Sequence, residues 1–285
     1  MSSRERFTTS RPSERASGDR DAATCRASQR IFERTDRPAL TWSFVSSGPS
    51  HSPTIDLSGG LPTGDAKTKA VRDMFDTISP RYDLVNRVMT FRLDVAWRRR
   101  TIDSLGLPAG SRILDLAAGT GDFCRDLSNR GFEAIGMDLS FGMLSHARTT
   151  SPLVQCDALH LPVPSGSVDG VTCGFALRNF TDLGAFFDET ARVVRPGGRI
   201  AFLDAASPEN PILRLGHGLY FGRIVPLIGS ALSDRTAYRY LPKSLAYLPD
   251  PPVMLDRLRF AGFSGVQRRL LLGGAAQLIV GTRQG

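Results

Sequence analysis

The sequence predicts an α/β domain built on a mostly parallel β-sheet. Short apolar runs alternate with helix-like segments between residues 112 and 203. Such runs are typical of strands that are buried on both faces, as they are in parallel sheets. The segments between them are long enough for the right-handed helical crossovers that parallel strands require. Two further apolar runs near the C-terminus are joined by Gly273 and Gly274, which indicates a hairpin.

Seven strands are expected. They cover residues 113–117, 134–138, 153–156, 168–173, 199–203, 266–272 and 276–282. Helices are expected between them at 122–130, 141–148 and 183–194, where the apolar residues recur at helical spacing. The same spacing before the first strand predicts three more helical segments, at 66–78, 82–88 and 95–102. The sheet is therefore expected to carry an N-terminal helical portion.

The chain divides into a tail and one domain. Residues 1–62 are predicted to be a disordered tail, because they mix Ser, Thr, Arg, Pro and Asp without an apolar period. Residues 66–285 have the length of a single large domain. Within it, residues 208–250 are predicted to be an insertion that is apolar on most faces and is interrupted by glycines. This insertion is either a cap over a site or ordinary core.

Composition narrows the classes of partner. The net charge of +8 is compatible with nucleic acid, anionic lipid or an acidic ligand. The basic residues are not interleaved with aromatic ones and form no known RNA module, so no nucleic-acid partner is expected. The four cysteines are scattered without a CxxC pair, which predicts reduced thiols in a cytoplasmic protein and no metal site. The sequence contains no run of about 18 consecutive apolar residues, so no transmembrane helix is expected.

A glycine-rich turn follows the first strand, in the sequence DLAAGTGD at 115–122. Small residues allow the backbone to turn tightly and a ligand to approach it closely. The helix that follows presents free N–H groups at its start. These features predict cofactor contacts at Gly119 and Gly121. The turn by itself does not distinguish one nucleotide-like cofactor from another.

Acidic residues at the ends of the next strands specify the cofactor further. Asp138 is placed to accept hydrogen bonds from both ribose hydroxyls of an adenosyl group, and Asp157, followed by Ala158, is placed to accept from an adenine amine. The carboxyl ends of these strands share one edge of the sheet. Asp115 and Asp122 add negative charge beside the turn, which suits a sulfonium and an ammonium better than a pyrophosphate. The predicted cofactor is S-adenosylmethionine, with Asp115 among its contacts.

The chain resembles the ubiquinone/menaquinone-biosynthesis C-methyltransferases, which include demethylmenaquinone methyltransferases, from about residue 66 to residue 283. One signature is MFDTISPRYD at 74–83 with Asn86 and Trp97-Arg98, and the most discriminating is FALRNFTD at 175–182. RPGG at 195–198 and YRYLPKS at 238–244 add to the resemblance. The sequence DAASP at 204–208 stands where many members have a Glu-Phe-Ser run. The resemblance implies the Rossmann-like fold of class I S-adenosylmethionine-dependent methyltransferases.

The resemblance implies cofactor contacts at Thr120, Asp138, Asp157 and Ala158, and it also implies the reaction. The expected activity is C-methylation of a prenylated quinol, with demethylmenaquinol converted to menaquinol. Arg178 is a candidate to stabilise the phenolate, directly or through water, and Tyr82 and Asn179 are candidates to orient the ring. Arg178 is alternatively a structural ion-pair partner, and Tyr82 a core aromatic residue. His146, His160 and His217 show no partner pattern, and they are expected to be non-catalytic.

A prenylated substrate resides in a membrane. We therefore expect the apolar stretch at 208–232 to contact its tail, and the Arg-rich surface to bring the protein to the inner face of the cell membrane. Ordinary core packing is the alternative for this stretch. Three other functions remain open: methylation of a benzoquinol, methylation of another natural product, and binding of S-adenosylmethionine by a catalytically silent regulator. The oligomeric state is not predicted.

Overall fold

The computed structural model describes residues 63–225, 240 and 244–285. The tail predicted at 1–62, and residues 226–239 and 241–243 of the predicted insertion, lie outside the described residues.

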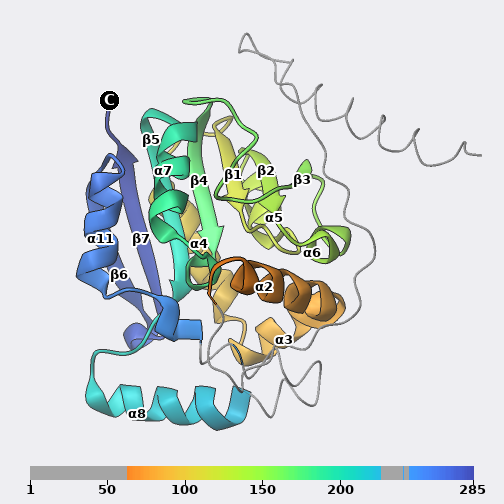
Figure 1. Cartoon of the computed structure of the whole chain (residues 1–285), viewed down its shortest axis with the longest axis vertical. Helices are drawn as coiled ribbons and strands as arrows, with labels where there is room; N and C mark the ends of the chain where they lie inside the picture. The colour runs from red at the N-terminus through yellow and green to blue at the C-terminus, as the bar shows by residue number, and fades with distance from the viewer. Residues whose placement is uncertain (1–62, 226–239, 241–243) are drawn as a thin grey trace, which may run out of the picture. The chain divides into compact units, whose positions relative to one another are not determined.

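The predicted α/β fold with a seven-stranded, mostly parallel sheet is confirmed (Figure 1). The strands are β1 (Arg112–Leu116), β2 (Glu133–Asp138), β3 (Leu153–Gln155), β4 (Val168–Gly174), β5 (Val194–Ala205), β6 (Phe263–Leu271) and β7 (Ala276–Arg283). Their order is β3-β2-β1-β4-β5-β7-β6, and β7 runs opposite to the other six strands. All residues of β1 are buried, as its apolar run predicts.

The strand order reverses direction at β1. Strands β2 and β3 continue the sheet on one side of β1, and β4 and β5 continue it on the other. The loops that follow β1 and β4 therefore leave in opposite directions and open a crevice at the carboxyl ends of these strands. Ligands bind at this position in doubly wound sheets.

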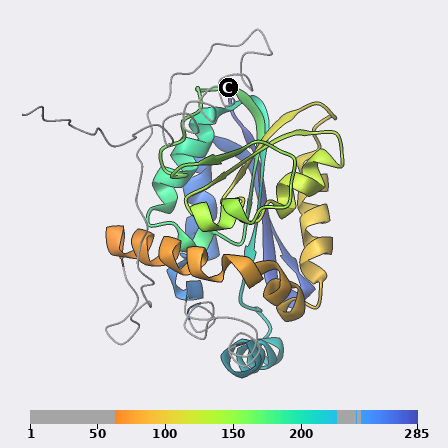
Figure 2. The same ribbon diagram turned by 90° about the vertical axis from the view of Figure 1, so that its right-hand side faces the viewer.

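Helices cover both faces of the sheet (Figure 2). Helices α7 (Leu183–Val193) and α11 (Pro251–Phe260) contact β5 and β6 on one face. Helices α4 (Leu93–Leu105) and α5 (Asp122–Ser128) lie on the other face, where α4 contacts β4, β5 and β7 and α5 contacts β1 and β2. The core under α7 contains the buried rings of Phe186, Phe187 and Phe202, with centroids 5.5–6.2 Å apart.

Helix α6 (Phe141–Ser145) is shorter than the sequence predicts. Apolar spacing had extended it to Arg148. Instead, the backbone N–H of Arg148 donates to the carbonyl oxygen of Thr120 at 2.9 Å, and this bond draws the chain toward the turn after β1. A long-range contact therefore overrides the local helical preference.

The N-terminal helices lie beyond the carboxyl ends of the parallel strands (Figures 1 and 2). Helices α2 (Gly64–Ile78) and α3 (Tyr82–Met89) are joined by a 3-10 turn that contains Pro80. They share a small core made of Val71, Met74, Ile78, Val85 and Tyr240. The described helices include none long and apolar enough to cross a bilayer.

Helix α8 (Pro211–Leu219) lies farther from the sheet than α2 and α3 (Figure 1). It continues directly into a π-helical turn, Tyr220–Ile224. The hydroxyl of Tyr220 donates to the carbonyl oxygen of Met89 at 2.7 Å, which attaches α8 to the end of α3.

Candidate active site

Two cavities meet at the carboxyl ends of β1 and β4. The first has a volume of about 100 Å³ and the second of about 400 Å³. Five residues line both of them: Tyr82, Ala117, Gly119, Gly174 and Phe175. A ligand in the first cavity therefore meets a ligand in the second at these residues.

The first cavity contains the acids that the sequence places at strand ends. Asp138, Asp157 and Ala158 all line it, and α2 covers it with Val71 and Phe75. These residues combine an apolar wall with carboxylates at successive strand ends, which suits an adenosine group. The structure thus brings three of the predicted cofactor residues together.

Asp138 links the glycine turn after β1 to the loop after β2. Its Oδ2 accepts from the backbone N–H of Gly119 at 2.8 Å, and its Oδ1 accepts from that of Ser140 at 2.8 Å. Burial raises the pKa of Asp138 to about 6, although the two N–H donors partly offset this effect by stabilising the ionised form.

We expect the affinity for S-adenosylmethionine to weaken as the pH falls below about 6. In the predicted contact, the ribose hydroxyls donate to the ionised Asp138 carboxylate, so cofactor binding is expected to favour that form and to lower the pKa further. The Kd is then constant above the pKa and rises by up to about tenfold for each pH unit below it. Calorimetric titration between pH 5 and 7 measures this, below the range in which the cofactor's own amino group titrates. Asp138→Asn, which cannot titrate, should show no such rise, and a wild-type Kd that is constant over this range would contradict the assignment.

The glycine turn positions its backbone toward the cavities. Gly119 and Gly121 have φ values of 57° and 78°, in the left-handed region that favours glycine. Gly119 lines both cavities and Thr120 lines the second. Gly121 instead caps α5, and a Cβ there would lie 2.7 Å from Cγ2 of Thr149. Gly121 therefore serves the predicted site by allowing the chain to turn.

Asp115 lies beneath the turn. It is 1% exposed, it accepts a hydrogen bond from Oγ1 of Thr172 at 2.9 Å, and Sγ of Cys124 lies 3.6 Å from its other oxygen. Burial raises its pKa to about 7, so much of its negative charge is absent at neutral pH. The structure places Asp115 outside the lining of both cavities. Direct contact between Asp115 and the cofactor stays a prediction.

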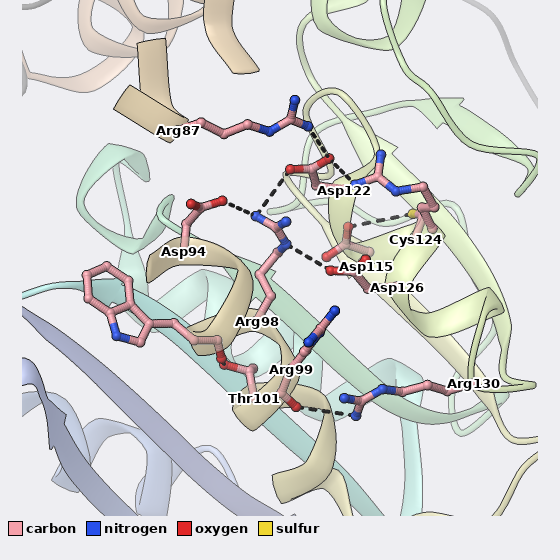
Figure 3. A network of polar contacts seen from close by, with 12 residues as sticks. Arg87, Asp94, Arg98, Arg99, Thr101, Asp115, Asp122, Cys124, Asp126 and Arg130 are labelled. Atoms are coloured by element: carbon pink, nitrogen blue, oxygen red, sulfur yellow. Dashed lines mark hydrogen bonds and ion pairs between the residues drawn. The ribbon is translucent and has the colours of Figure 1, made fainter. Parts of the chain in front are cut away.

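A buried ion network fixes the helix that follows the turn (Figure 3). Arg98 on α4 is 5% exposed and lies 2.6 Å from Asp94, 3.1 Å from Asp122 and 3.0 Å from Asp126. Asp122 and Asp126 belong to α5, so the guanidinium ties α4 to the start of α5. Since Asp122 directly follows Gly121, this network also fixes the cofactor turn. It gives a physical reason for Arg98 in the first signature.

Carboxylates from the N-terminal helices bind the glycine turn after β1 and the loop after β2. Oδ1 of Asp76 accepts from Oγ of Ser140 at 2.5 Å and from the N–H of Gly142 at 2.8 Å. Oδ1 of Asp83 accepts from Oγ1 of Thr120 at 2.5 Å. The sequence did not assign these roles to Asp76 and Asp83, although both belong to the MFDTISPRYD signature. Their position in that signature was the available signal.

Arg178 lies at the second cavity and is 6% exposed. Its guanidinium and its backbone N–H both bind the carboxylate of Asp204, and its Nε donates to Oγ of Ser244 at 3.1 Å. The ion-pair role that the sequence left open is therefore present. A guanidinium carries five N–H donors, so these contacts do not exhaust the group. Stabilisation of the phenolate of the methyl-accepting substrate by Arg178 stays a prediction.

Tyr82 and Asn179 occupy different parts of the site. Tyr82 stands at the junction of the cavities, with its ring edge-on to Phe75 at 5.8 Å. Burial raises the pKa of Tyr82, which keeps its hydroxyl protonated, while a hydrogen bond with Asn86 and the charge of Arg178 act in the opposite direction. Asn179 lines the first cavity, and its Oδ1 accepts from the Tyr240 hydroxyl at 3.4 Å.

The described residues contain no group of three or more His, Cys, Asp or Glu side chains arranged to hold a metal ion.

The model of the ubiE/COQ5 methyltransferase family matches residues 63–283. The chain belongs to this family. It is 41% identical over 233 residues to the demethylmenaquinone methyltransferase of Roseiflexus castenholzii, which covers 79% of this chain and 98% of that protein. It is also 41% identical over 220 residues to that of Thermus thermophilus, which covers 74% of this chain and all of the relative.

Solved structures show the same fold as this ubiE/COQ5-family chain. A methyltransferase from Thermotoga maritima, described as a possible histamine N-methyltransferase, has a TM-score of 0.54 at 18% identity and covers 75% of this chain and 99% of that one. Phosphoethanolamine N-methyltransferase 2 of Haemonchus contortus, solved with S-adenosylhomocysteine, has a TM-score of 0.54 at 14% identity. The match covers 75% of this chain and 60% of that one. The family and the fold identify an enzyme, an S-adenosylmethionine-dependent methyltransferase of class I.

Proposed function

We propose that this methyltransferase transfers the methyl group of S-adenosylmethionine to a ring carbon of demethylmenaquinol and forms menaquinol. The junction of the two cavities is the observation that carries the proposal. The first cavity suits the adenosine, and Tyr82, Gly119 and Phe175 line both cavities at the junction, which supports a position for the reactive end of the cofactor beside the second cavity. The names of the Roseiflexus and Thermus relatives support the same acceptor.

The second cavity suits a fused aromatic ring with a prenyl tail. Apolar side chains dominate its wall, including Met89, Phe91, Trp97, Phe123 and Leu272. Its volume of about 400 Å³ is four times that of the first cavity, at about 100 Å³. A large apolar chamber with a few polar groups is the usual form of a site for such a ligand.

The chemistry requires proximity and charge stabilisation. The methyl group is already activated by the sulfonium, and a ring carbon beside a hydroxyl becomes far more nucleophilic when that hydroxyl loses its proton. Holding the two groups in line supplies several kcal/mol of the barrier, on the order of 7 or more in well-oriented reactions. Arg178 is fixed by Asp204 and Ser244, so its remaining N–H donors are ready to stabilise the phenolate oxygen.

Replacement of Arg178 by Met is expected to lower kcat by roughly tenfold or more, because a donor to the developing oxyanion is lost. The affinity for S-adenosylmethionine should change little. Steady-state kinetics and calorimetry measure the two quantities. The double variant Arg178→Met/Asp204→Asn removes both charges, so it separates lost catalysis from the effect of a stranded carboxylate. Unchanged turnover in both variants would remove Arg178 from the mechanism.

An apolar surface lies next to the second cavity. Ile212, Leu215 and Leu219 on α8 are 80%, 77% and 52% exposed, and Phe91 beyond α3 is 73% exposed. The rings of Phe91 and Tyr220 are 5.9 Å apart, so the two groups belong to one region. We propose that this surface rests on the inner face of the cell membrane and admits the prenylated acceptor. Arg214 and Arg223 on the same segment favour anionic lipid.

The triple variant Ile212→Gln/Leu215→Gln/Leu219→Gln is expected to lose most of its binding to vesicles that contain anionic lipid, because apolar burial in the interface is removed. Vesicle sedimentation measures the bound fraction. Phe260→Gln is the matched control, because Phe260 is 91% exposed on α11. Equal binding of the triple variant and the wild type would contradict a role for this surface.

The quinone content of a strain that lacks the gene tests the acceptor. Accumulation of demethylmenaquinone, and its disappearance when the gene is restored, is the expected result. Accumulation of a demethylated benzoquinone would assign the other quinone instead. An unchanged quinone content would indicate a different small molecule or a silent regulator.

A further inference from the structure

Three acidic side chains line the second cavity: Asp83, Asp94 and Asp122. Two of them belong to the buried ion network, because Asp94 lies 2.6 Å and Asp122 lies 3.1 Å from the guanidinium of Arg98. Asp83 forms no ion pair with a Lys or Arg in the part of the chain that the structure describes, and its hydrogen-bond partner is the uncharged hydroxyl of Thr120. The second cavity therefore contains one acidic group that is not paired with a cation.

The two oxygens of Asp83 have different surroundings. Oδ1 accepts from Oγ1 of Thr120 at 2.5 Å, which holds the carboxylate against the glycine turn. Oδ2 has no hydrogen-bond partner within residues 63–225, 240 and 244–285, and it is not enclosed by protein atoms. The side chain is half-buried, at the start of α3. One oxygen thus fixes the carboxylate, and the other is available to a ligand in the second cavity.

The lining of the two cavities gives an order to the parts of the cofactor. Asp138 and Asp157 line the first cavity, Gly119 lines both, and Asp83 and Thr120 line the second. With the adenosine beside Asp138, the sulfur and the methionine end pass Gly119 and reach the side of the second cavity where Asp83 lies. This end carries an ammonium group, whose N–H donors form their strongest hydrogen bonds with a carboxylate.

We propose that Asp83 binds the α-ammonium group of S-adenosylmethionine through Oδ2, while Oδ1 stays bonded to Thr120. The assignment rests on the part of the proposed function that puts the reactive end of the cofactor at the junction, and it does not depend on which acceptor is methylated. An ammonium bound there also ties the cofactor to α3. This helix supplies Tyr82, Asn86 and Met89 to the wall of the second cavity.

Asp83→Asn in the full-length protein separates this role from a structural one. Asn keeps an oxygen that can accept from Thr120, but it lacks the charge. The ligands are S-adenosylhomocysteine and its deaminated analogue, in which hydrogen replaces the ammonium group, and calorimetry at pH 7 measures both Kd values. The ratio of the two Kd values is the factor by which the ammonium tightens binding. We expect this factor to be about tenfold smaller in Asp83→Asn than in the wild type.

Two measurements control for changes elsewhere. The ligand 5′-methylthioadenosine lacks the whole methionine end, so its Kd should agree within about twofold between the wild type and Asp83→Asn. Asp103→Asn removes an acid whose side chain is 68% exposed on α4, and it should keep the wild-type factor. A double comparison of ligand and variant cancels effects on the fold, because these change both Kd values alike.

The same factor in the wild type and in Asp83→Asn would overturn the assignment. An equal loss of affinity for all three ligands would also overturn it, since a carboxylate that only stabilises the start of α3 or holds Thr120 predicts that result. A wild type that shows the expected factor and does not methylate demethylmenaquinol would overturn the proposed acceptor and leave the role of Asp83 intact.

Discussion

Replacement of Arg98 by Met is expected to lower the free energy of unfolding by about 3–5 kcal/mol. The reason is the burial of its partners: Asp94 is 4% exposed and lies 2.6 Å from the guanidinium. Removing the cation leaves the Asp94 carboxylate buried without its counter-ion, and it also releases Asp122 and Asp126 at the start of α5. Urea denaturation, followed by circular dichroism, measures the loss.

Two variants make this result specific. Arg130→Met removes a guanidinium that is paired at the surface with Asp103, at 2.5 Å, and it should cost less than about 1 kcal/mol. Arg98→Met/Asp94→Asn should recover part of the stability, because the stranded charge is removed as well. If Arg98→Met and Arg130→Met are equally stable, the network of Figure 3 does not hold α4 to α5 as described.

Asp138→Ala is expected to raise the Kd for S-adenosylmethionine by about a hundredfold or more. Two hydrogen bonds from the ribose to a carboxylate contribute about 1.5–3 kcal/mol each, and each 1.4 kcal/mol corresponds to a tenfold change. The substitution also removes the acceptor that joins the N–H groups of Gly119 and Ser140. Isothermal titration calorimetry measures the Kd directly.

Two control variants separate the contribution of the Asp138 carboxylate from the effect of removing an acidic side chain elsewhere on the protein. Asp103→Ala removes an acid on the surface of α4, with a side chain 68% exposed, and should leave the Kd unchanged. Asp138→Asn retains an acceptor oxygen and should fall between the wild type and Asp138→Ala. A Kd for Asp138→Ala within twofold of the wild type would show that the adenosine lies elsewhere.

Much of the fold was predictable because its signals are local. All seven expected strands are present, and the hairpin closes with Leu271 opposite Ala276 around Gly273 and Gly274, both of which have positive φ values. Errors occurred where distant contacts decide an element's end. Helix α6 ends early because Arg148 bonds to Thr120, and β5 begins at Val194 rather than Arg199 because Val194 pairs with Val168 across a register shift.

The site was predictable where position along a strand determines position in space. Gly119, Thr120, Asp138, Asp157 and Ala158 all line the cavities, because the carboxyl ends of parallel strands share one edge. Position along a strand does not specify whether a side chain lines a cavity or is buried within the sheet. Asp115 stands on β1 itself and is therefore buried in the sheet beneath the turn.

Contacts between distant residues were not accessible from the sequence. Asp76 and Ser140 are 64 residues apart, Asp83 and Thr120 are 37 apart, and Arg178 and Asp204 are 26 apart. No local pattern encodes which acid meets which loop.

The proposed reaction is methyl transfer from S-adenosylmethionine in the first cavity to a quinol ring carbon in the second. Its most direct test is mass spectrometry of the products that the purified protein forms from methyl-deuterated S-adenosylmethionine and chemically reduced demethylmenaquinone. We expect S-adenosylhomocysteine and menaquinol in equal amounts, the menaquinol being detected as menaquinone after oxidation in air, with all three deuterium atoms in the ring methyl group. Binding of the cofactor without any labelled quinone, or a label on oxygen instead of ring carbon, would contradict it.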